Sequence, residues 1–224
     1  MLKLLILQIV ITFAFTIVYA QNTEKSINAL FFPAQSFLDT INTFKQEKDC
    51  AFYNKREQLA SSQNELYSEK LLQLNEIVLY NEYYYESYRI TRFGYFGVSH
   101  NPLSVRIENH SENVFLIVKY IHCSNYNHKK QKFNNIDLIV DTVNISKTNW
   151  EIFKNKINNI DFWNISPVEK TEIVVMDGST WIFEGKSNEK YHMVYRNVDT
   201  KEIREICLFL LKLSNTSIKK KEFY

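Results

Sequence analysis

The chain contains very little glycine and proline. Its 224 residues include only four Gly and three Pro. Turn-dense β-sandwiches and glycine-rich phosphate-binding loops both need such residues at fixed positions, so the composition argues against both classes. The sequence also lacks a Gly-x-Ser-x-Gly, Ser-x-x-Lys, P-loop or dinucleotide-binding motif. No local motif therefore indicates a particular reaction.

An excess of charge of either sign is also missing. Lys and Arg total 27 and Asp and Glu total 25, which gives a formal net charge of +2. Proteins that bind nucleic acid usually carry a strong basic excess, so we expect no nucleic-acid partner. Hydrophobic residues make up 45% of the chain and charged residues 23%. These values are typical of globular domains and exclude wholesale disorder.

Residues 1–20 have the pattern of a signal peptide. Lys3 supplies a short positive region, residues 4–18 are apolar, and Val18-Tyr19-Ala20 forms a small-x-small cleavage site before Gln21. An uncleaved membrane anchor is the alternative, because this apolar run is close to the shortest length that spans a bilayer. No second apolar run approaches about 20 residues. We therefore expect a periplasmic or secreted protein without stable membrane insertion after cleavage.

The chain has three cysteines, Cys50, Cys123 and Cys207. In an oxidising compartment they allow one disulfide, and the sequence leaves all three pairings open. Cys207 lies in an apolar helical pattern, which favours a packed thiol. His122 and Cys123, with His128 six residues after His122, are soft ligands without the paired spacing of a metal site. We therefore expect no metal ion and no cofactor.

The hydrophobic spacing changes at about Tyr88. Residues 21–87 have apolar residues at three- and four-residue spacings, which predicts a helical N-terminal region with a polar loop at Ser61-Ser62-Gln63-Asn64. Residues 88–214 instead contain short β-branched and aromatic segments separated by turn signals, which predicts strands. The predicted strands are 88–95, 103–108, 114–121, 136–145, 171–176, 179–184 and 191–196.

Two helices are expected within this second region. Thr148-Asn149-Trp150-Glu151 has the form of a capping box, followed by apolar residues at helical spacing to Ile160. A second such pattern starts at Asp199, with Glu202 three residues on. The sequence thus predicts an α+β fold: N-terminal helices, then a mainly antiparallel sheet (a meander plus a C-terminal hairpin) with two packed helices. Residues 215–224 form a basic tail, and the lack of a flexible linker near residue 87 favours one compact unit.

The C-terminal half carries an ordered set of motifs. These are Phe162-Trp163, Asp177-Gly178-x-x-Trp181-x-x-Glu184, Tyr191-His192-x-Val194-x-Arg196, and the Leu-rich stretch 206–213. In order and spacing they resemble a family of uncharacterised exported bacterial proteins, over about residues 88–214. The resemblance implies an exported protein of this architecture and does not imply a reaction.

The predicted C-terminal hairpin can be examined further. If Gly185–Lys190 is its loop, Glu184 lies opposite Tyr191. Strand alternation then puts His192 on one face and Glu184 on the other, which weakens any acid–base pair made from the two. The full set on the His192 face is Trp181, Phe183, His192, Val194 and Arg196, and the set on the other face is Ile182, Glu184, Tyr191, Met193 and Tyr195.

Two hypotheses for function follow. In the first, a small periplasmic hydrolase uses His192 as acid or base and Arg196 as an anion clamp, oriented by Asp177 or Glu184. In the second, these residues are structural: Arg196 pairs with a carboxylate, Asp177 and Gly178 form a turn, and the Trp side chains fill the core. We favour the second. The expected protein is then a non-enzymatic binding module, in a narrower form an inhibitor or immunity-type protein, and its partner is an envelope protein or a small ligand.

Overall fold

The structure is a computed structural model. It describes residues 30–34, 36–38, 50–82, 85–94, 102–127, 132–168, 179–188, 190–196, 200–216 and 218. For residues 50–57, 124–127 and 132–134 it describes the backbone alone. The predicted signal peptide and the predicted strand 171–176 lie outside these residues. The described elements all belong to one compact unit, Phe31–Tyr224.

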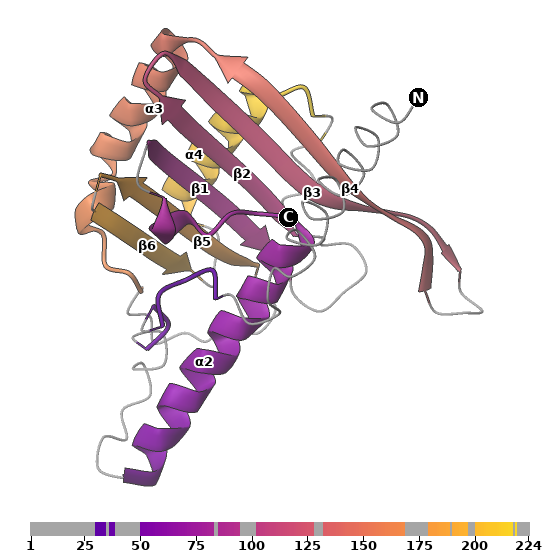
Figure 1. Cartoon of the computed structure of the whole chain (residues 1–224), viewed down its shortest axis with the longest axis vertical. Coiled ribbons are helices and arrows are strands. Elements are labelled where there is room, and N and C mark those ends of the chain that lie inside the picture. Colours follow the sequence, from indigo (N-terminus) through magenta and orange to yellow (C-terminus); the bar gives the residue numbers. More distant parts are fainter. Residues whose placement is uncertain are drawn as a thin grey trace, which may run out of the picture. The chain divides into compact units, whose positions relative to one another are not determined.

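Six antiparallel strands form one sheet with the order β4-β3-β2-β1-β5-β6 (Figure 1). Strands β1 to β4 form a meander, and the β5–β6 hairpin returns to pair with β1. This confirms the predicted α+β class and its meander-plus-hairpin sheet. The strands are β1 (Glu86–Phe93), β2 (Leu103–His110), β3 (Asn113–Asn127), β4 (Lys132–Ile145), β5 (Thr180–Ser187) and β6 (Lys190–Arg196).

Three α-helices accompany the sheet in the described part of the chain. They are α2 (Cys50–Gln73), α3 (Lys147–Asn159) and α4 (Lys201–Leu213), with short 3-10 helices η2 (Leu79–Asn81) and η3 (Phe162–Asn164). Among the described helices, none combines the length and hydrophobicity needed to cross a bilayer.

Both helix starts differ from the predicted ones. The N-cap of α3 is Ser146, whose Oγ accepts a hydrogen bond from the Asn149 amide, so the predicted cap at Thr148 is wrong. The N-cap of α4 is Thr200 rather than Asp199. In both cases two residues of types that are common at N-caps lie within two positions of each other, Ser146 and Thr148 at α3 and Asp199 and Thr200 at α4, and a sequence pattern alone does not choose between them.

Helices α3 and α4 pack on one face of the sheet and form the main core. Every second strand residue points to this face, and Trp150 and Phe153 of α3 meet them. Cys207 of α4 is buried there, as its apolar pattern predicted. Other buried members of this core are Tyr88, Ile90, Val105, Ile107, Leu116, Val118, Trp181, Phe183, Val194, Ile203, Ile206 and Leu210. We call the opposite side of the sheet the outer face.

A second cluster covers the outer face at β1, β5 and β6. Tyr67 of α2 stacks on Phe93 with ring centroids 4.9 Å apart, and its hydroxyl lies 3.3 Å from that of Tyr195. The other buried members are Phe31, Phe32, Phe37, Ala60, Leu71, Ile182 and Met193. This end of the sheet is therefore packed on both faces.

The polar stretch at Ser61–Asn64 lies inside α2 and is not the loop that the sequence predicted. Asn64 is fully buried, and its amide donates to the Phe32 carbonyl at 3.1 Å. Ser68 donates to the Asn64 side chain and accepts from the Phe31 amide. These polar side chains bind the backbone of the preceding segment, so the helix continues through them.

A tight turn joins β5 to β6, in place of the predicted loop from Gly185 to Lys190. Asn188 in this turn has a left-handed φ of 50°, a conformation that Asn tolerates better than most residues. Gly185 lies within β5, where a Cβ atom would come within 2.5 Å of Phe162 Cε1 and 2.9 Å of Tyr88 Cε1. The glycine thus serves the close approach of two rings rather than a turn.

The turn changes the hairpin register by two residues. Glu184 lies opposite Met193, so its predicted pairing with Tyr191 is wrong. Because a shift of two residues preserves alternation, each side chain keeps the face that the sequence predicted. Trp181 and Val194 point into the main core, and Glu184 and Met193 point to the outer face.

Candidate functional site

A buried carboxylate stands at the centre of a charged group on the outer face. Glu76, from the α2–β1 connection, meets one cation from each of three adjacent strands. Its Oε2 lies 2.9 Å from Arg106 Nε and 3.4 Å from Arg89 Nη1, and its Oε1 lies 3.4 Å from Lys119 Nζ. Arg89 lies directly opposite Arg106, and Lys119 lies opposite Ser104, which is two residues before Arg106. Strand alternation therefore places the three cations on one face of the sheet.

The charged group extends to both sides of Glu76. Arg89 Nε donates to Glu184 Oε2 at 2.6 Å, and Arg106 pairs with Glu108. We call this set the ionic cluster: Glu76, Arg89, Arg106, Glu108, Lys119 and Glu184. Its three cations balance its three carboxylates, and all six residues are buried. Buried charges are tolerated when they are paired in this way.

Burial and charge pairing oppose each other in the ionic cluster. Burial favours a neutral Glu76, but Arg106, Arg89 and Lys119 together outweigh it and hold the pKa of this carboxyl below its ordinary value. Burial also disfavours a charged Arg89, yet Glu184 and Glu76 outweigh it and raise the pKa of the guanidinium. Glu76 and Arg89 therefore remain charged at neutral pH.

Glu184 has the kind of shifted pKa that marks many catalytic carboxyls. Burial raises its pKa in spite of Arg89. Burial also raises the pKa of Tyr191 well above its ordinary value, so this hydroxyl stays protonated and donates to Glu184 Oε1 at 2.9 Å. Both oxygens of Glu184 are thus engaged and the residue is fully buried. This arrangement fits a structural ion pair better than a group that meets a substrate.

The end of α2 carries Glu76 into this position. The Glu76 amide donates to the Leu71 carbonyl and the Asn75 amide donates to the Leu72 carbonyl. With Asn75 at a left-handed φ of 49°, this is the Schellman arrangement that closes many helices. Lys119 then donates to the Asn75 carbonyl, which fixes the helix end over β3.

His192 and Arg196 bind the backbone of the segment after η3. His192 Nε2 lies 3.0 Å from the Ile165 carbonyl oxygen. Arg196 donates to the carbonyls of Ser166 at 3.1 Å and Pro167 at 3.2 Å. Burial is the main cause that lowers the pKa of His192, so its imidazole is neutral at neutral pH. Both side chains thus attach this segment to β6.

The predicted catalytic group is divided between the two sides of the sheet. His192 and Arg196 lie on the side of the main core, and Glu184 lies on the outer face. Asp177 and Gly178 fall outside the described residues. Trp181 is buried in the main core, and partly buried Trp163 packs against it. Within the described chain, no three His, Cys, Asp or Glu side chains gather closely enough to hold a metal ion.

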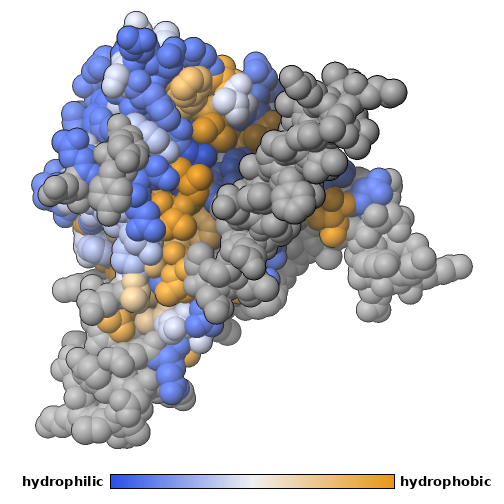
Figure 2. All heavy atoms as spheres, in the orientation of Figure 1, coloured by the Kyte–Doolittle hydropathy of each residue, from blue (hydrophilic) through white to orange (hydrophobic). Residues whose placement is uncertain are grey.

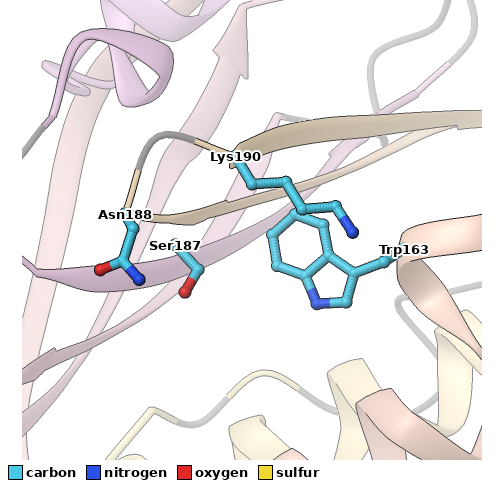
Figure 3. Close-up of a pocket in the computed structure, with 4 residues that line it drawn as sticks. All are labelled: Trp163, Ser187, Asn188 and Lys190. Atoms are coloured by element: carbon cyan, nitrogen blue, oxygen red, sulfur yellow. The ribbon is translucent and has the colours of Figure 1, made fainter.

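Trp163 also lines a shallow, open hollow of about 540 Å³ (Figure 3). The other lining residues are Ser187, Asn188 and Lys190 of the β5–β6 turn region. The Lys190 side chain extends over the indole, with Nζ 4.7 Å from the ring centroid. The aromatic surface of the hollow is therefore already in contact with a cation.

A row of hydrophobic side chains is exposed on the outer face of β4. Ile136 is 65% exposed, Leu138 38% and Val140 53%. We call these three residues the β4 row. They share the outer face because they lie opposite Cys123, Ile121 and Lys119 of β3. On the face turned to the viewer in Figure 2, hydrophobic side chains reach the surface among hydrophilic ones.

The two edges of the sheet differ. At the β6 edge, the Tyr195 amide donates to the Pro167 carbonyl at 2.7 Å, and Val168 forms a parallel bridge with Tyr195. At the other edge, β4 pairs with β3 alone among the strands that the structure describes. Strand β4 forms this edge of the sheet (Figure 1). The backbone groups of β4 that face away from β3 therefore lie at the same edge as the β4 row.

Sequence reasoning missed both the ionic cluster and the β4 row. Charged residues at every second strand position, such as Arg106 and Glu108, normally indicate a solvent-facing side. The sequence feature that could have indicated the β4 row is the run Ile136-Asp137-Leu138-Ile139-Val140, which places apolar residues on both faces of the strand.

A comparison with models of protein families and one with curated protein sequences each found no match.

Proposed function

We propose that this protein is an exported, non-enzymatic binding module that contacts another polypeptide through the β4 row. The observation that carries the proposal is the exposure of Ile136, Leu138 and Val140 on an edge strand. Exposed apolar residues that are grouped on one element are typical of interaction surfaces. Extended peptides commonly bind by adding a strand to such an edge, where main-chain hydrogen bonds supply affinity and alternate side chains supply specificity.

The contacts of the polar residues support a role without catalysis. His192 and Arg196 bind backbone carbonyls of residues 165–167, and Glu184 is enclosed with Arg89 and Tyr191. A general acid or base must reach its substrate, and these groups are already engaged within the fold.

The sequence supports a place in the cell envelope. Residues 1–20 have the signal-peptide pattern, and residues 88–214 resemble an exported bacterial family. A narrower form of the proposal is an inhibitor or immunity-type protein that blocks an enzyme by covering it. Such a protein needs an export signal and a binding surface but no catalytic group.

The first experiment expresses the full coding sequence with its own leader. We expect the product in the envelope fraction, with the mass of a chain whose first residue is Gln21. This product serves as bait for an envelope extract, beside Leu138→Asp and Ile152→Asp variants. Ile152 is a matched control because it is an apolar residue on α3 with a similar exposure of 41%.

The expected result is a stoichiometric partner that the wild type and Ile152→Asp bind and Leu138→Asp loses. In a direct assay with the purified partner, the wild type and Ile152→Asp should again bind and Leu138→Asp should not. Equal binding by all three proteins would show that the β4 row is not the contact surface and would overturn the proposal.

The alternative is a small periplasmic hydrolase that uses His192, Arg196 and a carboxylate. One observation favours it: the neutral His192 ring lies 6.4 Å, centroid to centroid, from Trp163, which lines the hollow. Ester, amide and glycoside substrates would then be hydrolysed by the wild type and not by His192→Ala. The binding proposal expects no such difference, and His122→Ala, at an exposed histidine of β3 away from the hollow, is the control.

A further inference from the structure

We infer that the β4 row binds a second copy of this chain, with the two β4 strands antiparallel and a two-fold axis at Leu138. The inference rests on the proposed function, because it names the polypeptide that the row contacts. It predicts a continuous sheet across two copies in which both helix-covered faces lie on the same side.

The spacing of the β4 row is symmetric about Leu138. In an antiparallel pair of identical strands, residues at equal distances from the axis lie opposite each other. An axis at Leu138 therefore pairs Leu138 with its own copy and Ile136 with Val140. All three exposed apolar side chains then face an apolar partner, which is the arrangement that stabilises cross-strand pairs. An axis at Val140 would instead place Leu138 opposite Thr142.

Two aspartates exclude the neighbouring registers. An axis at Asp137 would place two copies of that residue opposite each other, and an axis at Ile139 would place Asp137 opposite Asp141. Like charges in such positions destabilise a strand pair. The axis at Leu138 avoids both cases, because Asp137 then lies opposite Ile139 and Asp141 lies opposite Asn135. The charged residues of β4 thus select the same register as the apolar ones.

The edge has little of the protection that usually prevents strand pairing: the segment after α4 meets it at Asp141, whose Oδ2 accepts a hydrogen bond from the Asn215 amide at 2.8 Å. Natural edge strands are often protected by Lys, Pro or a covering segment. Residues 135–141 contain neither Lys nor Pro. The opposite edge, at β6, is bridged by Val168 of the same chain. Among the two edges, β4 is therefore the one that is suited to pair with another copy.

The test of the dimer is its mass in solution. The product of the full coding sequence is studied by sedimentation equilibrium over a range of concentrations, with Leu138→Asp and Ile152→Asp beside it. Leu138→Asp brings two carboxylates together at the axis, so we expect dimer dissociation to become easier by about tenfold or more. The Ile152→Asp variant should match the wild type, because α3 lies outside the pairing.

The test of the register is disulfide trapping in a Cys123→Ser background. Opposite residues of an antiparallel pair have Cα atoms about 4.5–5.5 Å apart, within the range for a disulfide. Leu138→Cys should therefore link two copies through residue 138. Single variants Ile136→Cys and Val140→Cys should not link to themselves, whereas an equal mixture of the two should give a 136–140 link. Peptide mapping identifies each link.

The outcomes separate this inference from the proposed function. A monomer at all concentrations, with no 138–138 link, overturns the dimer. If Leu138→Asp still loses a different envelope partner in the binding assay, the proposed function stands and only the identity of the partner changes. If the monomeric protein also shows no binding that depends on Leu138, both proposals fail. A dimer that Leu138→Asp leaves intact overturns the inference as well.

Discussion

The two ends of the sheet use their outer faces in opposite ways. At the β1–β5–β6 end, Arg89 and Glu184 are fully buried under α2 and its connection to β1. At the β4 end, Ile136 and Val140 are more than half exposed. Hydropathy alone would place these residues the other way round. Burial here depends on what surrounds a position: charge is buried where opposite charges enclose it, and apolar groups are exposed where the described chain covers them least.

The largest expected effect comes from Arg89, at the β1–β5–β6 end of the sheet, which we call the closed end. We expect Arg89→Met to lower the free energy of unfolding by about 3–5 kcal/mol, because Glu184 and Glu76 would keep buried charges with a partner removed. Urea denaturation measures the loss. The double variant Arg89→Met/Glu184→Met should lose less than the single one, since it removes both members of the pair. A single variant as stable as the wild type would contradict the assigned role of this ion pair.

A smaller effect is expected at Gly185, where the Phe162 and Tyr88 rings approach the backbone of β5 closely. Gly185→Ala would push a methyl group into the Phe162 and Tyr88 rings, and overpacking of this kind costs about 1–3 kcal/mol. Ser187→Ala, on the same strand and the same face, should stay within about 0.5 kcal/mol of the wild type. Thermal or urea unfolding compares the two. Equal stabilities of the two variants would show that the rings move aside at no cost.

The pH dependence of the closed end should follow Glu76. Its pKa in the folded protein is lower than its ordinary value of 4.5, so its charge stabilises the fold fully above that value. The stabilisation is lost as the pH falls through the lower, folded pKa. Glu76→Gln should therefore be less stable than the wild type at neutral pH by about 1–3 kcal/mol, and this difference should shrink in acid.

Unfolding curves from neutral to acidic pH measure this difference directly. Glu151→Gln, at an exposed position on α3, is the control and should change stability by less than about 0.5 kcal/mol. A wild-type advantage over Glu76→Gln that grew in acid would have the wrong sign and would refute the explanation.

The smallest expected effect is at the β4 end of the sheet. Ile136→Thr should alter the free energy of unfolding by no more than about 0.5 kcal/mol, because the side chain is largely exposed and Thr keeps a β-branched shape. The same change at Ile182, buried on the outer face of β5, should cost about 2–4 kcal/mol. Both are measured at low protein concentration, where copies are separate. Similar losses at the two positions would remove the difference between the two ends.

The fold was largely predictable because strand alternation and turn signals are local. The meander, the C-terminal hairpin and the two packed helices were all expected. The hairpin register is not predictable in the same way, because a glycine such as Gly185 is a turn signal by its residue type. Its actual role depends on Phe162, which is distant in sequence, and a glycine that admits a neighbouring ring looks the same in sequence as one that turns the chain.

The site was less predictable than the fold. The sequence drew attention to His192 and Arg196, whose residue types are common in active sites, and the structure uses both to hold the segment after η3. Glu76 gave no signal at all, because its partners lie 13, 30 and 43 residues further along the chain, on three strands. Such convergence depends on the sheet topology, which alternation does not specify.

The position of Glu76 has a consequence for cooperativity. Its carboxylate contacts β1, β2 and β3, and its neighbour Asn75 closes α2. Separation of α2 from the sheet would leave three cations without this carboxylate, so partial opening is costly. Helix and meander should consequently open as one unit, and amides in residues 60–73 should exchange with solvent at the same rate-limiting step as those of β2. The Glu76 side chain thus couples the opening of α2 to the opening of β1, β2 and β3.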